Sequence, residues 1–332
     1  MIPTAAQIPD LLHTFRACPG LAHPHLQTVV AARLTWSWEP PSCTQLVPLA
    51  DGDTLALEVS TPAAWQAWQP TVLLVHGLCG SHRSPYMQRL ARKLLRHGLR
   101  AVRMNLRGCG SGTGLARQPY HSGRSADVLA VLHDLQQHTP DSAVTLVGFS
   151  LGGNVVLKLA GELHNAAPAT LQHVIAVCPP VDLAACVRRL ARPANRLYDA
   201  YFTRQLCADV VQRQQCFPDL PPATLPPTLS LHAFDECYTA PQCGFQDAAD
   251  YYRQSSAAPL IPRIALPCHI LCAADDPLID TQVLTSSPLP PPVRLLCTRT
   301  GGHLGFLGLP GRTGGYRAMD AQLLAWILGR PA

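Results

Sequence analysis

Residues Ala143 to Ala160 read Ala-Val-Thr-Leu-Val-Gly-Phe-Ser-Leu-Gly-Gly-Asn-Val-Val-Leu-Lys-Leu-Ala. An apolar, strand-like run leads through Gly148-Phe149-Ser150-Leu151-Gly152 into a run that suits a helix. In this Gly-x-Ser-x-Gly pattern a strand turns abruptly into a helix, which strains the backbone of the serine and exposes its hydroxyl group. Glycine is needed on both sides because the turn leaves little room. The stretch predicts a strand, a tight turn and a helix, with Ser150 as a candidate nucleophile; the pattern alone also allows an ordinary glycine-rich turn.

The rest of the chain from residue 71 onward alternates short apolar runs with amphipathic helical patterns. That alternation is typical of a mainly parallel sheet flanked by helices on both faces. Besides the strand before Ser150, the expected strands are 71–75, 100–106, 174–178, 269–273 and 293–297. The clearest expected helices are 85–97, 125–137, 197–215 and 318–328, with Ser84 as the N-cap of the first and Pro85 at its first helical position. The sequence therefore predicts an α/β fold.

The spacing of these elements divides the chain into four parts. About ninety residues separate the strand at 174–178 from the next one, and they read as helices joined by a proline-rich connector. Insertions of that length in compact domains usually cover or bind something, so a helical lid is expected between the late strands. The predicted parts are an N-terminal arm with the first antiparallel strands (1–70), the core with the serine turn (71–180), the lid (181–266) and the rest of the core (267–332). In the first part, Asp51-Gly52 is a hairpin signal.

The composition indicates a soluble globular protein. Of the 332 residues, 47% are hydrophobic and 14% are charged, yet no uninterrupted apolar stretch approaches the ~18 residues that cross a membrane. The first twenty residues do not show the basic and apolar regions of a secretory signal. Thirteen cysteines, an odd number without paired Cys-x-x-Cys spacing, favour reduced thiols. We therefore expect a cytoplasmic protein without an integral membrane segment; the sequence makes no prediction about its oligomeric state.

Charge and motif content argue against several kinds of partner. The net charge of +5 is dispersed, and the basic cluster at residues 89–96 occupies the polar side of an amphipathic helix, so no nucleic acid partner is predicted. The glycine-rich run 108–114 follows a strand but does not open directly into a helix, as a dinucleotide-binding loop must. The histidines, cysteines and carboxylates show no ligand pair with metal-site spacing. We expect neither a cofactor nor a metal.

A serine hydroxyl becomes a useful nucleophile when an imidazole accepts its proton and a carboxylate orients that imidazole. In sheets of this kind the order along the chain is serine, acid, histidine, with the last two after late strands. The strand at 269–273 runs into Asp275-Asp276, and the strand at 293–297 is followed by Gly301-Gly302-His303. His303 is the predicted general base. Asp276 is the preferred acid because of the turn-like residues after it, and Asp275 remains an alternative because either carboxylate could cap that turn.

The negative oxygen of a tetrahedral intermediate also needs preorganised hydrogen-bond donors. One predicted donor is the backbone NH of Leu151, at the start of the helix after the serine. The second is the backbone NH of Leu78, because the loop His76-Gly77-Leu78-Cys79-Gly80 follows a strand where such enzymes place their second donor. A simple tight turn is the alternative interpretation of that loop.

With these residues in place, the chain resembles the YheT-like α/β-hydrolases, the fourth AB-hydrolase family. The resemblance covers nearly the whole chain and rests on Pro24-His25-Leu26-Gln27-Thr28, His76-Gly77-Leu78, Ser84-Pro85-Tyr86, Asn105-Leu106-Arg107-Gly108-Cys109, Tyr120-His121-Ser122-Gly123, the serine turn with Asn154, Tyr251-Tyr252-Arg253-Gln254-Ser255-Ser256, Asp275-Asp276-Pro277 and Gly301-Gly302-His303-Leu304-Gly305-Phe306. It implies an α/β-hydrolase fold, a triad of Ser150, Asp276 and His303, and esterase or lipase-like activity on small-molecule or lipid-like carboxylic esters. Eukaryotic members carry an N-terminal membrane anchor, whereas this chain resembles the soluble bacterial type.

Two other functions remain open at this stage. An acyltransferase would use the same triad and differ only in its second acceptor. A binding module could keep the fold without catalysis, although the complete set of Ser150, Asp276 and His303 weighs against it.

Overall fold

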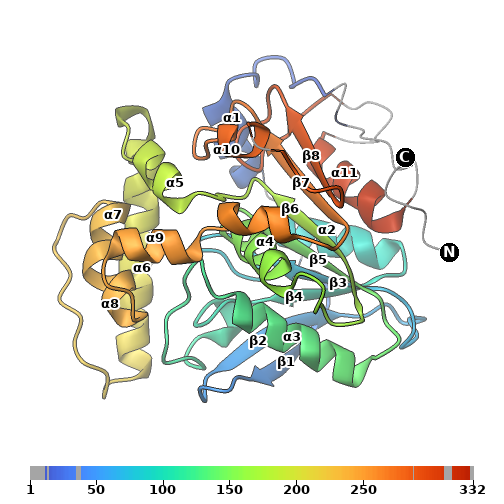
Figure 1. Ribbon diagram of the computed structural model, residues 1–332, viewed down its shortest axis with the longest axis horizontal. Helices are drawn as coiled ribbons and strands as arrows, with labels where there is room; N and C mark the ends of the chain where they lie inside the picture. Colours follow the sequence, from blue (N-terminus) through green and yellow to red (C-terminus); the bar gives the residue numbers. More distant parts are fainter. Residues whose placement is uncertain (1–11, 13–14, 35–38, 287, 310–315, 330–332) are drawn as a thin grey trace.

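A single eight-stranded sheet forms the centre of the computed structural model, which describes residues 12, 15–34, 39–286, 288–309 and 316–329 (Figure 1). The strands are β1 (Cys43–Pro48), β2 (Thr54–Ser60), β3 (Thr71–Val75), β4 (Arg100–Met104), β5 (Val144–Phe149), β6 (Leu171–Val177), β7 (Cys268–Ala273) and β8 (Val293–Thr298). Their order across the sheet is β1-β2-β4-β3-β5-β6-β7-β8. Strand β2 pairs antiparallel with both of its neighbours, β1 and β4, whereas β3 to β8 all run parallel to one another. This arrangement confirms the predicted mainly parallel α/β architecture.

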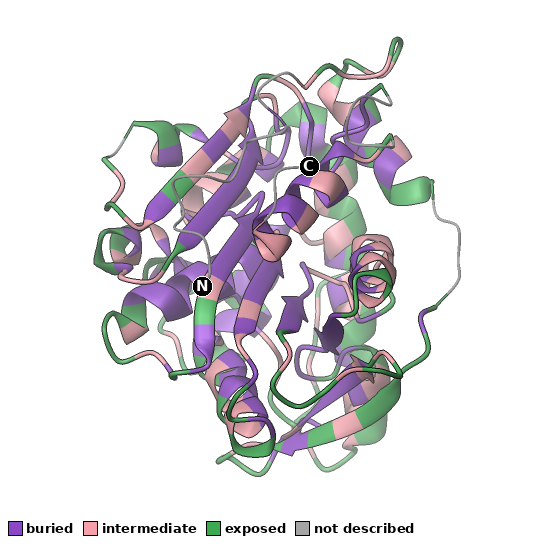
Figure 2. Ribbon diagram, turned by 90° about the vertical axis from the view of Figure 1, so that its right-hand side faces the viewer, coloured by how far each residue is buried: buried purple, intermediate pink, exposed green. Residues whose placement is uncertain are grey.

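Both faces of the sheet are covered, so the central strands are buried on both sides (Figure 2). In β3, Val72 and Leu74 belong to one apolar cluster, whereas Leu73 and Val75 belong to the cluster on the opposite face. This alternation follows from the two-residue period of a strand. Helices α2 (Pro85–Arg96) and α11 (Ala318–Leu328) contribute to the first cluster, and α3 (Ser125–His138) and α4 (Leu151–Leu163) to the second.

Two local predictions needed correction. The strand expected to reach residue 106 ends at Met104, because the NH of Leu106 donates to Nε2 of His76 and the chain leaves the sheet. Ser84 stands before the first residue of α2, as expected for an N-cap, but its hydroxyl accepts the NH of Ser81 instead of a helical NH. Pro85, at the first helical position, needs no cap for its own nitrogen and already has a helical φ angle.

The long segment between β6 and β7 is helical. It contains α5 (Leu183–Leu190), α6 (Arg196–Cys216), α7 (Leu231–Phe234), α8 (Ala240–Gln242) and α9 (Ala248–Ser255). These helices form a separate layer beside the sheet, on the left in Figure 1. The short helical turn 258–263 follows them and lies against α4. The remaining helices outside the insertion are α1 (Pro24–Arg33) and α10 (Gln282–Thr285).

Two further observations bear on the character of the chain. All thirteen cysteines lie within the described ranges, and each is a free thiol. Across the part of the chain that the structure describes, none of the helices combines the length and apolar content required to cross a bilayer.

Candidate active site

Ser150 lies in the turn between β5 and α4, with φ +52° and ψ −119°. The two flanking glycines make this turn possible. A Cβ atom at Gly148 would collide with the carbonyl group of Gly152, and a Cβ atom at Gly152 would lie 2.5 Å from the carbonyl oxygens of Val75 and His76. The backbone NH of Ser150 remains satisfied, because it donates to the carbonyl of Val177 at 2.8 Å. The sequence pattern therefore forms the strained turn that it predicts, with the serine at the carboxyl end of the parallel strands.

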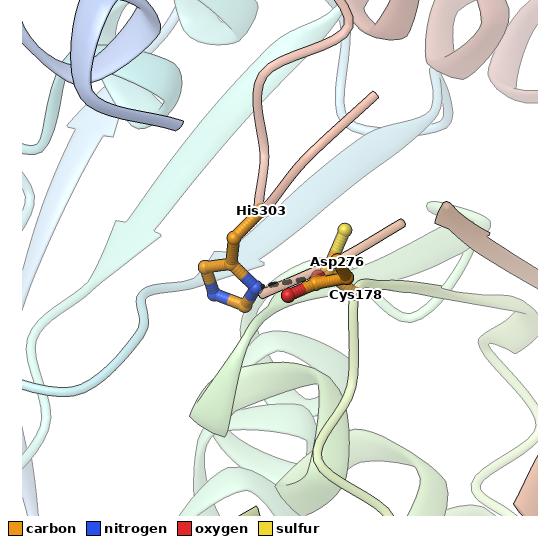
Figure 3. Close-up of side chains that lie close together, drawn as sticks. All are labelled: Cys178, Asp276 and His303. Carbon is orange, nitrogen blue, oxygen red and sulfur yellow. Dashed lines mark hydrogen bonds and ion pairs between the residues drawn. The ribbon is translucent and has the colours of Figure 1, made fainter. Parts of the chain in front are cut away.

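His303 connects Ser150 to a carboxylate from a third part of the chain. Its Nε2 lies 2.9 Å from Oγ of Ser150, and its Nδ1 lies 2.8 Å from Oδ2 of Asp276. Asp276 is fully buried and His303 is 9% exposed. Figure 3 shows the imidazole pointing toward the Asp276 carboxylate, with the hydrogen bond between them. The three side chains that sequence reasoning selected thus form one hydrogen-bonded line.

The two neighbouring aspartates have different partners. Oδ1 of Asp276 accepts the backbone NH groups of Leu278 and Ile279, at 2.8 and 3.1 Å, which leaves Oδ2 for the imidazole. Asp275 instead accepts the NH of Gly302 at 2.9 Å. Burial raises the pKa of Asp275, whose other carboxylate oxygen has no hydrogen-bond partner within the described residues. The geometry therefore favours Asp276 as the partner of the imidazole, and Asp275 fixes the backbone of the loop that carries it.

Helix α1 supports the loop that carries His303 from the other side. The hydroxyl of Thr28 accepts the backbone NH of His303 at 2.9 Å. The side chain of Gln27 donates to the carbonyl of Leu307 and accepts its NH at 2.7 Å. Sequence reasoning found these two residues only through the family motif that contains them, because nothing in their local pattern shows that they contact a loop about 275 residues away.

The loop after β3 has donors of the kind that an oxyanion requires. The NH of Gly77 donates to Oη of Tyr86 at 2.9 Å, the NH of Cys79 donates to Oη of Tyr120 at 3.0 Å, and the NH of Gly80 donates to the carbonyl of Gly77. Within the described part of the chain, no acceptor is bonded to the NH of Leu78. The two tyrosines were not selected from the sequence as site residues, and they hold the NH groups on either side of the predicted donor.

The second predicted donor, the NH of Leu151, belongs to the first residue of α4, where backbone NH groups have no partner inside the helix. Leu78, Leu151 and Ser150 all line the same cavity. Two backbone donors without a partner among the described residues therefore lie in the cavity wall next to the serine, and the positive end of the α4 dipole favours negative charge at this position.

His76 anchors the loop after β3 to the sheet. Its Nε2 accepts the NH of Leu106, so Nδ1 carries the hydrogen and donates to the carbonyl of Gly77 at 2.8 Å. Burial lowers the pKa of His76 to about 4, and the ring is therefore neutral at physiological pH. A neutral ring with one donor and one acceptor satisfies both of its backbone partners.

A cavity of about 1300 Å³, counting the space at its open mouth, extends from Ser150 and His303 into the helical insertion. Its walls are mainly apolar and include Leu183, Val187, Leu190, Phe202, Leu206, Val210, Phe217, Leu231, Phe234, Tyr238, Leu278 and Ile279. Asp209, an exposed residue of α6, also lines it, and partial desolvation raises the pKa of this carboxyl group. The insertion thus lines the cavity beside the serine and provides most of the apolar surface around it.

One buried thiol near the triad was not anticipated. Cys178 follows the last residue of β6, and its Sγ, a carboxylate oxygen of Asp276 and a ring nitrogen of His303 lie within 4.8 Å of one another (Figure 3). Such a group could in principle hold a metal ion. However, burial raises the pKa of Cys178 well above its ordinary value, whereas metals bind the thiolate, and both ring nitrogens of His303 already face protein partners. The arrangement fits an oriented imidazole better than a metal centre.

The glycine-rich run at 108–114 forms part of the cavity wall. Residues 110–112 form a short turn, and α3 does not begin until Ser125, so no helix N-terminus follows the glycines as a dinucleotide loop requires. Gly108, Cys109 and Thr113 instead line the cavity. Burial raises the pKa of the Cys109 thiol well above its usual range, which makes it an unreactive wall residue.

Comparisons with known proteins agree with this geometry. A family model described as "alpha/beta hydrolase fold" matches residues 70–308. The Escherichia coli protein named "Putative esterase YheT" is 34% identical over 87% of this chain and 86% of its own length. Human "Phospholipase ABHD3" is 25% identical, covering 87% and 75% of the two chains, and the Saccharomyces cerevisiae "Medium-chain fatty acid ethyl ester synthase/esterase 2" is 28% identical, covering 72% and 58%.

Solved structures support the same fold. The Pyrococcus furiosus esterase Pf2001 superimposes with a TM-score of 0.54 at 16% identity, covering 88% of this chain and 97% of its own. At that identity the likeness concerns the fold alone. The family match, the similarity to the Escherichia coli protein and the eight-stranded sheet together show that this chain belongs to the α/β-hydrolase fold family, as a YheT-like member.

Proposed function

We propose that this protein is a serine hydrolase that cleaves carboxylic esters, with Ser150 as nucleophile, His303 as general base and Asp276 as the group that orients His303. The observation that carries the proposal is the line of hydrogen bonds from Oγ of Ser150 through both nitrogens of His303 to Oδ2 of Asp276, at 2.9 and 2.8 Å. The names of the relatives, an esterase, a phospholipase and an ethyl ester synthase/esterase, support the ester class.

In the first half of the reaction, Oγ of Ser150 attacks the ester carbonyl carbon while its proton moves to Nε2 of His303. The carbonyl π electrons move to the oxygen, which accepts hydrogen bonds from the NH groups of Leu78 and Leu151. Asp276 accepts from Nδ1 and stabilises the imidazolium that forms. When the intermediate collapses, the bond to the alkoxy oxygen breaks, the proton on Nε2 passes to that oxygen, and the alcohol leaves.

In the second half, a water molecule attacks the acyl-enzyme. His303 takes a proton from the water, the carbonyl oxygen again becomes negative at the same two donors, and the proton is finally returned to Oγ of Ser150 as the carboxylic acid leaves. The same residues serve both halves, so no further group is needed to balance protons.

The cavity supports an apolar acyl group as the part of the substrate that is buried. Burying apolar surface is favourable by roughly 25 cal/mol per Å², so a wall of aliphatic and aromatic side chains favours longer chains over acetyl groups. Most of this wall comes from α5, α6 and α7. We therefore also propose that residues 181–266 act as a lid that determines acyl preference.

Transfer of the acyl group to an alcohol instead of water is the second candidate. One specific finding favours it: the yeast relative is named both a synthase and an esterase of ethyl esters. An apolar cavity also disfavours water near the acyl-enzyme. Product analysis with and without a candidate alcohol separates the two reactions, because ester exchange without release of free acid would reject hydrolysis.

The direct test of the proposal is the rate of hydrolysis of p-nitrophenyl esters from acetate to dodecanoate. We expect the value of kcat/KM to rise with chain length and then fall. Leu206→Trp, which adds volume to the cavity wall, should move the optimum to shorter chains, whereas Leu46→Trp, at an exposed position on β1, should leave the profile unchanged. Absence of hydrolysis for every chain length would reject the function.

A further inference from the structure

Helix α6 carries an apolar stripe on its outer surface. Leu197 is 77% exposed, Tyr201 is 53% exposed and Val211 is 54% exposed, and all three belong to this helix. Their spacing of four and ten residues, with the exposed Ala208 between Tyr201 and Val211, places them on one narrow face of a helix with 3.6 residues per turn. Large apolar side chains gathered on one exposed face usually mark a contact surface.

The segment that contains this stripe exposes more basic than acidic side chains. Residues 182–209 contain five arginines and three aspartates; the carboxylate of Asp199 accepts the backbone NH of Leu231, and Asp209 is exposed. Four of these arginines are exposed, namely Arg188, Arg192, Arg196 and Arg204. The exposed charged side chains of residues 182–209 are therefore mainly basic, four arginines against one aspartate.

The opposite side of the same helices faces the cavity. Phe202, Leu206 and Val210 of α6 line it, as do Leu183 and Val187 of α5. The stripe and the cavity are therefore separated by the thickness of one helix, about 10 Å. A surface in contact with the stripe would therefore lie on the side of α6 that faces away from the cavity.

We propose that the outer face of α6, the stripe of Leu197, Tyr201, Ala208 and Val211 with its exposed arginines, docks onto the surface of an anionic lipid bilayer. An amphipathic helix of this kind lies in the plane of the interface, with apolar side chains in the acyl boundary and basic ones at the head groups. Tyrosine suits that boundary, and arginine can bury its stem while its guanidinium reaches the phosphates. Each basic residue near an anionic leaflet adds to the attraction.

A second copy of the chain fits the stripe less well. The spacing of the stripe would suit a helix partner, but Arg204 lies seven residues from both Leu197 and Val211, at the centre of the stripe. A two-fold antiparallel pair of α6 helices would place Arg204 against its own copy, and a parallel pair would oppose every arginine to itself. Like charges brought together in this way repel, whereas anionic lipid head groups neutralise them.

The test is co-sedimentation of the full-length protein with vesicles of phosphatidylcholine alone or with about 30% phosphatidylglycerol. We expect the protein to bind the anionic vesicles at least about tenfold more tightly and to be released by salt. Two double variants probe the surface, Leu197→Ser with Tyr201→Ser and Arg192→Gln with Arg196→Gln. Each should weaken binding about tenfold or more.

Matched control variants carry serine or glutamine substitutions at exposed positions outside the insertion. Leu46→Ser with Trp68→Ser removes two exposed apolar side chains, and Arg96→Gln with Arg294→Gln removes two exposed charges, all outside the insertion. Both controls should bind like the unaltered protein. Thermal melting and hydrolysis of a soluble ester check that every variant is folded.

Several results would overturn this inference. They are the same affinity for neutral and anionic vesicles, no binding to either, equal loss in the control variants, or a stable dimer that the Leu197 and Tyr201 substitutions dissociate. Because vesicle binding is measured without turnover, failure of the proposed ester hydrolysis would leave this test intact, and the two proposals can fail separately.

Discussion

Oδ1 of Asp275 accepts the backbone NH of Gly302 at 2.9 Å, so the carboxylate next in sequence to Asp276 holds the residue before His303 rather than the imidazole itself. The two adjacent aspartates thus act on the same loop in different ways. Asp276 binds the ring of His303, and Asp275 binds the backbone that presents it.

This division predicts different effects of the two amide substitutions. Asp276→Asn removes the negative charge opposite Nδ1 of His303 and allows the wrong tautomer, so kcat should fall by about 10² to 10⁴. Asp275→Asn retains an oxygen that can accept the Gly302 NH, and kcat should fall by less than about tenfold. Steady-state kinetics on a soluble ester measure both. A larger loss in Asp275→Asn would reassign the acid.

The hydroxyl group of Tyr120 positions the loop that contains Leu78. Cys79, whose NH donates to that hydroxyl at 3.0 Å, has a φ of +54°, a conformation that a non-glycine residue adopts only when its surroundings hold it. In Tyr120→Phe the acceptor is lost and the Leu78 NH should drift from the oxyanion. We expect kcat to fall by about tenfold or more, with KM nearly unchanged.

Tyr251→Phe is the matched control for that variant. Its hydroxyl also accepts a backbone NH, that of Ser122 at 3.1 Å, but on a different loop. Both substitutions should lower the melting temperature by similar amounts. If Tyr251→Phe lowers kcat as much as Tyr120→Phe, the effect is a general loss of stability and not a role for Tyr120 at the oxyanion.

The close approach of α4 to the strand ends predicts that Gly152 cannot be replaced. In Gly152→Ala the new Cβ would lie 2.5 Å from the backbone oxygens of Val75 and His76. Because this is closer than van der Waals contact, the backbone of the turn or of the strand end has to move. Stability should fall by about 1–3 kcal/mol and activity should be nearly lost. Gly153→Ala places its Cβ 3.1 Å from Cβ of Pro179 and should be tolerated far better in urea unfolding. Equal stability of the two variants would contradict the packing described for the turn.

The burial of His121 should make the free energy of unfolding depend on pH. Burial lowers its pKa to about 3, whereas the unfolded chain binds the proton near 6.5. Between these values the unfolded state holds more protons, so stability falls as the pH decreases from about 6.5 toward 3. His121→Asn, which keeps an acceptor for the NH of Gly123, should reduce that slope by up to about 1.4 kcal/mol per pH unit.

Urea unfolding at pH 7, 6 and 5 measures the slope. His133→Asn, at an exposed position of α3, should leave it unchanged. If His121→Asn keeps the full pH dependence of the unaltered protein, then His121 is not held neutral in the folded state.

The sequence predicts local elements well where the pattern has one strong cause. The bounds of β3 and α11 agree with the expected 71–75 and 318–328, since a short apolar run and a helical period each dominate there. The buried positions of α3, including Val128 and Leu135, also follow directly from helical spacing. Ser150 and His303 could be selected as candidates because motif and strand order both constrain them.

Other features depend on contacts that no local pattern contains. Whether Ser84 caps its helix depends on the loop that precedes it. In the structure the hydroxyl group of Ser84 accepts the backbone NH of Ser81, so it does not cap the helix. The hydroxyl group of Tyr120 accepts a backbone NH from a loop 41 residues earlier in the chain, and no local sequence pattern indicates that contact. Cys178 could have been suspected, since it follows a strand next to the serine strand and therefore lies at the same edge of the sheet.

The measurement that tests the central claim most directly is peptide mapping by mass spectrometry after brief mixing with a p-nitrophenyl ester and acid quenching. The account predicts an acyl mass on the peptide that contains Ser150, formed in a burst with p-nitrophenol, and no adduct or turnover in Ser150→Ala. Turnover in Ser150→Ala at the rate of the unaltered protein, or an adduct on another residue in both proteins, would contradict it.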